Sequence, residues 1–409
     1  MLNKRKIIND PVYGFITIPT DLVFDLIEHP YFQRLRYIKQ LGMTHLVYPG
    51  ALHTRFHHAL GAMHLMKLAI DTLKSKGHTI TAEEEEAVAI AILLHDIGHG
   101  PFSHALEHTI VEGISHEDIS MLLMDKLNKQ FNGQLTMAIS IFNGTYAKGF
   151  LHEMVSSQLD MDRLDYLNRD SFFTGVSEGV ISSERIIKML NVKDDHITVE
   201  EKGIYSIEKF LVARRLMYWQ VYFHKTVIAA EQLLVKILQR SRELALGGHD
   251  LFATPALGHF LKKTISRDVF INEDHHIETF TALDDTDIIS AVKVWAHSDD
   301  FVLSKLCTDF INRKLYHVDI TNELPDDAIL SKLSEKAIKK YGIQENDAHY
   351  FVFKDIILNN AYTAGDGFIR ISMKNGSIKD ITTASDNSNL EALAKTVKKY
   401  ILCYSKDLA

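Results

Sequence analysis

The feature that most constrains this chain is an apolar run that ends in histidine and aspartate. Residues 87–94 read AVAIAILL and lead directly into HDIGHGPFSH, residues 95–104. A helix with this run enters a core, where polar side chains must form hydrogen bonds or bind an ion. Neighbouring side chains on a helix point about 100° apart, so His95 and Asp96 can approach one ion only at a helix end or beside a bend. The glycines and proline of residues 98–101 supply that break. For this pair alone, a buried histidine satisfied by Asp96 remains the simpler interpretation.

Composition indicates an ordinary globular protein. With 409 residues, 46% of them hydrophobic and 24% charged, the chain can form one large domain and a smaller one. The only cysteines, Cys307 and Cys403, exclude a disulfide framework and a cysteine zinc site, which favours a reducing, cytoplasmic location. We expect no membrane span, because no apolar run approaches about 20 residues, and no signal peptide, because residues 1–10 contain no apolar signal-peptide core.

Charge and histidine content narrow the function further. The formal net charge of −8 argues against nucleic acid as the main partner. Histidine is unusually frequent, with 22 residues, many of them between positions 53 and 116. This concentration of histidines favours a function that involves a bound metal ion.

Apolar spacing and capping signals predict a mainly α fold with a smaller C-terminal α+β module. Candidate N-caps are Thr20, Thr81 and Ser115. Helices are expected at residues 31–41, 56–76, from 82 to His95, at 152–168, and at 207–244 as one helix or a close pair. We expect a large helical domain at residues 1–312, with its motif region at 50–170, and a module at 313–409.

Short extended segments complete the prediction. A hairpin is expected between residues 197–199 and 204–206, with its turn at Lys202-Gly203. Residues 349–356 and 368–381 are β-rich, and residues 389–402 are predicted to form an amphipathic helix.

Two distant segments supply what a metal site would need. His58 opens the helix at 56–76, and Asp162 lies in the helix predicted at 152–168. With His95 and Asp96 they offer two imidazoles and two carboxylates from three helices, a set that suits a divalent ion with open positions for water and substrate. Taken alone, His58 reads as a satisfied core histidine and Asp162 as a surface carboxylate.

Five motifs then occur in one order along the chain. They are FQRLRYIKQLG at 32–42, YPG at 48–50, the segment at 55–61, the run at 95–104 and the segment at 160–170. From Lys6 to about Lys225 the chain resembles the HD-domain deoxynucleoside triphosphate triphosphohydrolases, both the bacterial dGTPase-like members and the catalytic core of the vertebrate enzyme. This resemblance implies an HD-domain helical bundle.

The resemblance assigns chemistry to specific residues. It implies that His58, His95, Asp96 and Asp162 hold one divalent metal ion per subunit. It implies a catalytic pair in His104 and Glu107, which act at the α-phosphate, and it places His99 and His116 beside the metal, as residues that orient water or phosphate or as structural support.

The same resemblance identifies a substrate pocket for a deoxynucleotide. By its motifs the phosphate-binding residues are Arg55, Arg163, Tyr166 and Arg214. Gln40 and Asp170 match residues that form hydrogen bonds with the sugar 3′-hydroxyl. Leu41 and Tyr222 match residues that pack where a 2′-hydroxyl would project, which would discriminate against ribose. Tyr218 stands where the vertebrate enzyme has histidine, so the preferred base stays open.

A further set matches the nucleotide effector site between subunits of the vertebrate enzyme. These residues are Lys6, Asn9, Glu28, Gln33, Arg36 and Arg185. A salt-bridged N-terminal brace is an equally good interpretation. An effector site would imply a homo-oligomer, a dimer or a tetramer.

The leading hypothesis is a metal-dependent hydrolase that releases inorganic triphosphate from a dNTP. Two alternatives stay open, an HD phosphohydrolase acting on a mono-, cyclic or modified nucleotide, and a nucleotide-binding regulator with weak catalysis. Histidine and aspartate ligands admit Mn²⁺, Mg²⁺, Fe, Ni²⁺, Co²⁺ or Zn²⁺.

Overall fold

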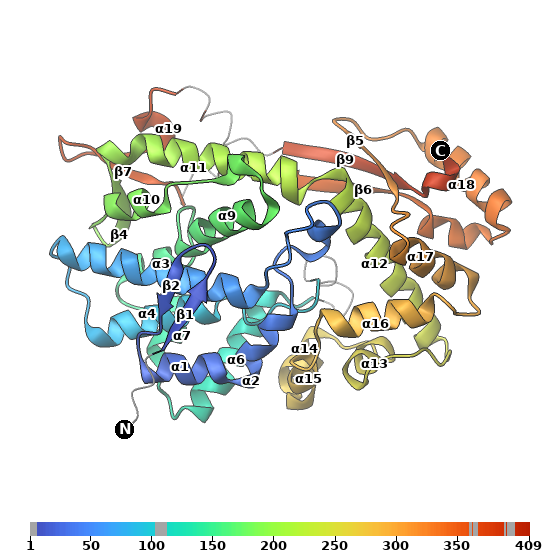
Figure 1. Ribbon diagram of the computed structural model, residues 1–409, viewed down its shortest axis with the longest axis horizontal. Helices are drawn as coiled ribbons and strands as arrows, with labels where there is room; N and C mark the ends of the chain where they lie inside the picture. The colour runs from blue at the N-terminus through green and yellow to red at the C-terminus, as the bar shows by residue number, and fades with distance from the viewer. Residues whose placement is uncertain (1–5, 103–112, 360–361, 363–366, 388–389, 391–396) are drawn as a thin grey trace.

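The computed structural model describes residues 6–102, 113–359, 362, 367–387, 390 and 397–409. It is a mainly α protein with small sheets at its periphery (Figure 1), as the sequence predicts. The helices of the first half are α1 Asp21–Glu28, α2 Pro30–Gln33, α3 Arg55–Ser75, α4 Ala82–Leu94, α6 His116–Gln130, α7 Thr136–Phe142, α8 Gly149–Val155, α9 Met161–Thr174 and α10 Ser183–Met189. Those of the second half are α11 Ile204–Met217, α12 Lys225–Leu246, α13 Pro255–Leu261, α14 Arg267–Asn272, α15 Asp274–Phe280, α16 Asp285–Trp295, α17 Phe301–Ile311, α18 Asp327–Tyr341 and α19 Ile381–Ala384.

Helices α3 and α4 form the centre of the core. Thr81 caps α4 by accepting a hydrogen bond from the Glu84 amide, while the Glu84 carboxylate accepts one from the Thr81 amide. Every residue from Ala87 to Leu94 is buried, because α4 packs against α1, α3, α7 and α8. The helix ends at Leu94, so His95 and Asp96 lie where it breaks, as predicted.

The strands form three small sheets. The N-terminal hairpin pairs β1 Ile7–Asp10 with β2 Gly14–Thr17. A second sheet has the order β3-β4-β7-β8, and a third has the order β5-β9-β6. The strands of these two sheets are β3 Leu190–Lys193, β4 His196–Glu200, β5 His317–Thr321, β6 Val352–Asn359, β7 Arg370–Ser372, β8 Ile378–Asp380 and β9 Val397–Tyr404. Strand β7 pairs in parallel with β4, so part of the predicted C-terminal module joins a sheet begun by the helical core.

The predicted hairpin at residues 197–206 is wrong. Strand β4 instead pairs with β3, and the turn between them is Asp194-Asp195, with φ angles of 51° and 61°. Aspartate tolerates this left-handed backbone, which two-residue hairpin turns require. Gly203 serves packing, because a Cβ there would lie 2.6 Å from Val199 Cγ1.

Two predicted helices are shorter or divided. The segment at 31–41 is helical only to Tyr37, because Ile38 becomes extended and Lys39 forms an isolated bridge with Thr54. The helix predicted at 152–168 is split into α8 and α9. Asp160 ends the break by capping α9, since its carboxylate accepts hydrogen bonds from the Ser157 and Arg163 amides at 2.8 and 2.7 Å.

The predicted C-terminal helix at 389–402 is also wrong where the structure describes it. Residues 397–404 form β9, the central strand between β5 and β6. Pairing on both sides satisfies the backbone of this segment and overrides its helical spacing. The helix predicted at 207–244 is a close pair, α11 and α12, joined by a π-helical turn at Tyr218–Tyr222. Among the described residues, no helix has the length and apolar character that crossing a membrane demands.

Candidate metal centre

Helices α3, α4 and α9 bring the four predicted ligands together. The Nε2 atoms of His58 and His95 lie 3.4 Å apart. Asp162 Oδ1 is 3.1 Å from His58 Nε2 and 3.6 Å from His95 Nε2. Asp96 completes the group, with Oδ1 3.4 Å from His95 Nε2 and Oδ2 3.8 Å from His58 Nε2. Three helices therefore place two imidazole nitrogens and two carboxylates around one point.

Both rings are oriented through their far nitrogens. His58 Nδ1 donates to Asp165 Oδ2 at 2.8 Å, and His95 Nδ1 donates to the carbonyl oxygen of Ile92 at 2.6 Å. Since a carboxylate and a carbonyl only accept, the protons of neutral rings lie on Nδ1 and the lone pairs of Nε2 face each other. This arrangement, in which an outer hydrogen bond fixes the tautomer of a ligating histidine, is typical of metal sites.

A chain of buried charges supports His58 from behind. Arg169 Nε donates to Asp165 Oδ2 at 2.9 Å, and its NH1 group donates to Asp10 Oδ2 at 2.7 Å. Gly61 makes this contact possible, because a Cβ there would lie 2.0 Å from Asp165 Oδ1. The spacing of α3 and α9, which carry His58 and Asp162, thus depends on a missing methyl group.

The electrostatics of the cluster are those of a cation site. Burial disfavours a charged ring at His58, but hydrogen bonds and charge interactions with Asp162 and Asp165 raise its pKa to about 10. Burial likewise disfavours the charged Asp162, yet the two histidines hold its pKa below the ordinary value. The carboxylates stay ionised and draw positive charge between themselves.

This donor set fits a divalent ion. Two Nε2 atoms and two carboxylates that converge within 3.1–3.8 Å need a positive charge between them, either a proton on an imidazole or a metal ion in its place. Nitrogen and oxygen ligands in this ratio suit Mn²⁺, Fe, Co²⁺, Ni²⁺ or Zn²⁺, with Mg²⁺ a harder alternative.

His99 and His116 lie beside Asp96, as predicted. His99 Nε2 is 3.3 Å from Asp96 Oδ1, and the His116 ring stacks on the His99 ring with a centroid distance of 3.9 Å. Burial and the positive charge of Arg55 keep the pKa of His99 well below its ordinary value. A neutral His99 is therefore available to Asp96 and to groups that enter beside it.

Arginines hold the turn that follows α4. Arg55 NH1 donates to Asp96 Oδ2 at 2.6 Å. Arg34, which the sequence analysis did not single out, donates to the carbonyl oxygen of His99 at 2.9 and 2.8 Å and to that of Ile97 at 3.1 Å. Gly98 is also required, because a Cβ there would lie 2.2 Å from the His116 carbonyl oxygen.

Three predicted phosphate-binding arginines retain hydrogen-bonding capacity. Among the described residues, the buried Nε atoms of Arg55, Arg163 and Arg214 are without a hydrogen-bond partner. Arg163 also forms an ion pair with Asp160, and Arg214 NH1 donates to Gln158 Oε1 at 3.1 Å. Buried guanidinium donors with no partner are costly in a folded protein, which suits a site that a ligand completes.

Two of the predicted sugar-binding residues, Asp170 and Tyr222, form one network with His53. Tyr222 donates its hydroxyl proton to Asp170 Oδ2 at 2.7 Å, and His53 Nε2 lies 2.8 Å from Asp170 Oδ1. Burial and the charge of Asp170 raise the pKa of Tyr222 well above its ordinary value, so the phenol stays protonated. His53 stacks on Phe173 at a centroid distance of 4.5 Å and holds Asp170 from one side.

Three further predicted substrate residues, Tyr166, Tyr218 and Gln40, adjoin this network. The rings of Tyr166 and Tyr218 contact Tyr222 edge-on, with centroid distances of 6.3 and 5.3 Å. Gln40 lies on the segment that pairs with residues 53–55, and its Oε1 is buried without a partner among the described residues. Leu41 follows it and packs partly buried against the core.

The catalytic pair and the candidate effector residues also stay predictions. His104 and Glu107 lie outside the described residues. Of the candidate effector residues, Lys6, Asn9, Glu28, Arg36 and Arg185 are exposed, while Gln33 accepts a hydrogen bond from Arg36 Nε at 2.8 Å. Arg185 NH2 lies 3.4 Å from the carbonyl oxygen of Lys202.

Several residues that position the site carry no signal that the sequence motifs reveal. Asp165, Arg169 and Asp10 orient His58, and His53 orients Asp170. One local signal existed, since Asp165 and Arg169 are four apart on a helix and can pair. The contacts with Asp10 and His53 join segments more than a hundred residues apart and leave no local pattern.

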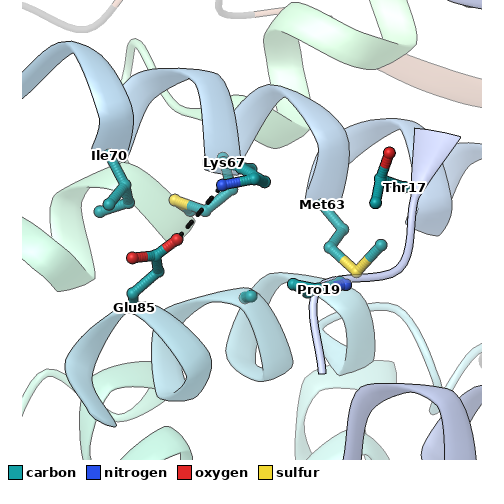
Figure 2. Close-up of a pocket in the computed structure, with 8 residues that line it drawn as sticks. Thr17, Pro19, Met63, Lys67, Ile70 and Glu85 are labelled. Carbon is teal, nitrogen blue, oxygen red and sulfur yellow. Dashed lines mark hydrogen bonds and ion pairs between the residues drawn. The ribbon is translucent and has the colours of Figure 1, made fainter. Parts of the chain in front are cut away.

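The structure also contains a small pocket elsewhere on α3. It lies between α3, α4 and the end of β2, with Met63, Ile70 and Pro19 in its wall (Figure 2). Lys67 and Glu85 pair across it at 3.4 Å. Its volume of about 10 Å³ is the room that one water molecule needs, so it is too small for a nucleotide.

Comparison with known proteins agrees with this geometry. The HD domain model matches residues 55–169, and a model described as an HD associated region matches residues 181–248. The uncharacterized protein YwfO of Bacillus subtilis is 33% identical over 422 residues, which cover 100% of this chain and 94% of that protein.

Solved and curated relatives extend the match. The crystal structure of a phosphohydrolase from Bacteroides thetaiotaomicron has 54% identity and a TM-score of 0.95, with 98% of this chain and 100% of that chain covered. The deoxynucleoside triphosphate triphosphohydrolase SAMHD1 homolog of Dictyostelium discoideum is 35% identical over 54% of this chain and 46% of that protein.

These matches coincide with the elements that carry the four predicted ligands. The region from residue 55 to 169 contains α3, α4 and most of α9, and with them His58, His95, Asp96 and Asp162. The chain belongs to the HD-domain family and is an HD-domain phosphohydrolase.

Proposed function

We propose that this protein hydrolyses deoxynucleoside triphosphates to a deoxynucleoside and inorganic triphosphate. The observation that carries the proposal is the cluster of His58, His95, Asp96 and Asp162, with Arg55 paired to Asp96. Like Arg55, the buried Arg163 and Arg214 have Nε atoms that lack a partner among the described residues. A triphosphate carries about four negative charges, which these cations would neutralise on an otherwise acidic protein. The name of the Dictyostelium relative supports the same substrate class.

The residues divide the work of binding. The chemistry that a divalent ion supplies at this cluster is Lewis-acid activation of a phosphoryl oxygen and of water. Arg55, Arg163 and Arg214 would hold the phosphates. The charges of Arg214, Arg163 and Asp162 all act on the Tyr166 hydroxyl, which supports a common pocket for these groups.

The proposed reaction breaks one bond. Water adds to the α-phosphorus, the bond from phosphorus to the 5′ oxygen breaks, and the leaving oxygen takes a proton. His104 and Glu107 are proposed to manage this proton, with neutral His99 and stacked His116 orienting the attacked phosphate. The triphosphate thus receives the hydroxyl group of the water molecule, and the nucleoside receives the proton.

Selection for deoxyribose is proposed to rest on packing. Asp170, fixed by Tyr222 and His53, would accept a hydrogen bond from the 3′ hydroxyl. Leu41 and the Tyr222 ring would occupy the space of a 2′ hydroxyl, which would then be buried without a partner.

A hydrolysis screen with the four dNTPs tests the proposal. The full chain with Mn²⁺ or Mg²⁺ should release triphosphate and nucleoside in equal amounts from at least one dNTP, as measured by ion-exchange chromatography. Added GTP or a second dNTP tests the candidate effector site. Release of only orthophosphate or pyrophosphate would overturn the proposal, and tight dNTP binding without turnover would identify a regulator instead.

A further inference from the structure

A second histidine cluster lies away from the proposed active centre, between α13 and α15. One ring nitrogen from each of His259, His275 and His276 lies within 4.8 Å of the others. His259 comes from α13, and the two neighbouring histidines come from the first turn of α15. In Figure 1 these helices lie together at the edge of the molecule beside α14 and α16.

The hydrogen bonds of the cluster leave a single proton between two facing nitrogens. His276 Nε2 is 3.3 Å from Glu273 Oε2, and since a carboxylate only accepts, this nitrogen carries the proton of the neutral ring. His276 Nδ1 then offers its lone pair to His259 Nε2, which lies 2.8 Å away. A metal ion can replace the shared proton if the two rings separate by about 0.5 Å.

Two of the three rings favour the neutral form that binds metal. Burial keeps the pKa values of His259 and His276 below their ordinary value. Neutral imidazole is the ligand form, so little proton competition opposes a metal at neutral pH. Glu273 Oε2, at 3.3 and 3.6 Å from His276 and His275, supplies a compensating negative charge.

We propose that His259, His275 and His276 form a second site for a transition-metal ion of the Zn²⁺ class, with Glu273 as its supporting carboxylate. Three nitrogen ligands favour Zn²⁺, Ni²⁺, Cu²⁺ or Co²⁺ over Mg²⁺ and Ca²⁺, which prefer oxygen. The ion would link α13 to α15, and the centre that contains His58 and His95 would contribute no ligand to it.

Helix α15 connects this site to the turn that carries the HD motif. At the far end of α15, the Phe280 ring packs against Gly100. A Cβ on Gly100 would lie 3.3 Å from two carbons of that ring. The Arg34 guanidinium lies 5.2 Å from the Phe280 ring centroid, and the same side chain binds the His99 carbonyl oxygen. Metal binding at the second site would therefore stiffen the support of the turn at residues 97–100.

Zinc titration of the full chain tests the site. Metal is removed with a chelator, and Zn²⁺ is returned in competition with a chromophoric indicator. His275→Asn should bind one Zn²⁺ fewer than the parent chain in the micromolar range, or bind it about 100-fold more weakly. His275 is 56% exposed at its side chain, so its replacement leaves the core intact.

Matched variants make the outcome decisive. His297→Asn alters an exposed histidine just beyond α16 and should bind Zn²⁺ like the parent chain. His259→Gln should reproduce the loss, whereas Asp162→Ala should weaken only the other site. The parent chain should also gain about 2–5 °C in Tm at the Zn²⁺ concentration that fills the second site. Equal Zn²⁺ binding by the parent chain, His275→Asn and His259→Gln would overturn the proposal.

Discussion

The two histidine clusters differ in what surrounds their nitrogens. At the cluster of His58, His95, Asp96 and Asp162, called here the HD cluster, His58 is fully buried and its Nε2 atom faces two carboxylates. Asp162 keeps 27% of its side chain exposed. At the second cluster, His275 and Glu273 are 56% and 53% exposed, and the other neighbours are imidazoles. Carboxylates beside a partly open position suit hydrolysis, whereas a nitrogen-rich cluster on the surface suits a link between two helices.

The clusters also differ in depth of support. His58 is held by the successive buried pairs Asp165–Arg169 and Arg169–Asp10. The second cluster depends on Glu273, a single half-exposed carboxylate. Replacement of a supporting residue should therefore weaken metal binding more at the HD cluster than at the second cluster.

Asp162→Ala gives the largest expected effect. Triphosphate release should fall by about 10³-fold or more, because the change removes one carboxylate of the cluster and uncovers the charge on two histidines. Steady-state kinetics measures the loss, and Zn²⁺ binding at the second cluster should stay unchanged. Asp299→Ala, at an exposed position, is the control. Turnover within tenfold of the parent enzyme would contradict the assigned centre.

Gly61→Ala should destabilise the protein by about 3 kcal/mol. The new Cβ would lie 2.0 Å from Asp165 Oδ1 and 2.2 Å from an Arg169 nitrogen, so the buried ion pair must move. Urea denaturation followed by circular dichroism measures the change. The same substitution at Gly258 in α13 meets only Ala253 at 3.6 Å and should be tolerated. Equal free energies of unfolding for the two variants would contradict this difference between the two regions.

Asp165→Asn should weaken metal binding at the HD cluster by about 10–100-fold. The amide keeps the shape but loses the charge that orients His58 and neutralises Arg169. Glu273→Gln is the equivalent change at the second cluster and should affect only Zn²⁺ binding there. Competition titrations of both variants, with each metal, compare the two supports directly. A larger loss from Glu273→Gln would reverse the ranking.

Glu231 tests how burial acts on a carboxyl group without the compensating charges found at the clusters. Burial alone raises the pKa of Glu231 to about 7. A carboxyl with a raised pKa binds its proton more tightly in the folded protein. The free energy of unfolding should therefore fall as pH rises from about 4.5 to 7. Glu231→Gln should add about 1–2 kcal/mol at pH 8 and little at pH 4. Thermal melts at both pH values measure this difference, and an equal shift at both would exclude the titration.

Local patterns predicted the elements that depend on local physics. The capping box at Thr81, the apolar run after it and the glycines behind His95 fix where α4 begins and ends. The family motifs assigned the proposed ligands residue by residue, and the structure brings those four side chains together. Tertiary contacts decided the rest. Pairing with β5 and β6 makes residues 397–404 a strand, and the bridge between Lys39 and Thr54 ends the helix near Tyr37.

The ion pair between Asp10 and Arg169 has a practical consequence for the N-terminal hairpin. Arg169 shares its charge between Asp10 and Asp165, so a change of charge on the His58 ring alters the balance of both contacts. Phe15, on the same hairpin, is 65% exposed and free to carry a label. A fluorine nucleus on that ring would act as a reporter of metal occupancy at the centre, read from the surface of the protein.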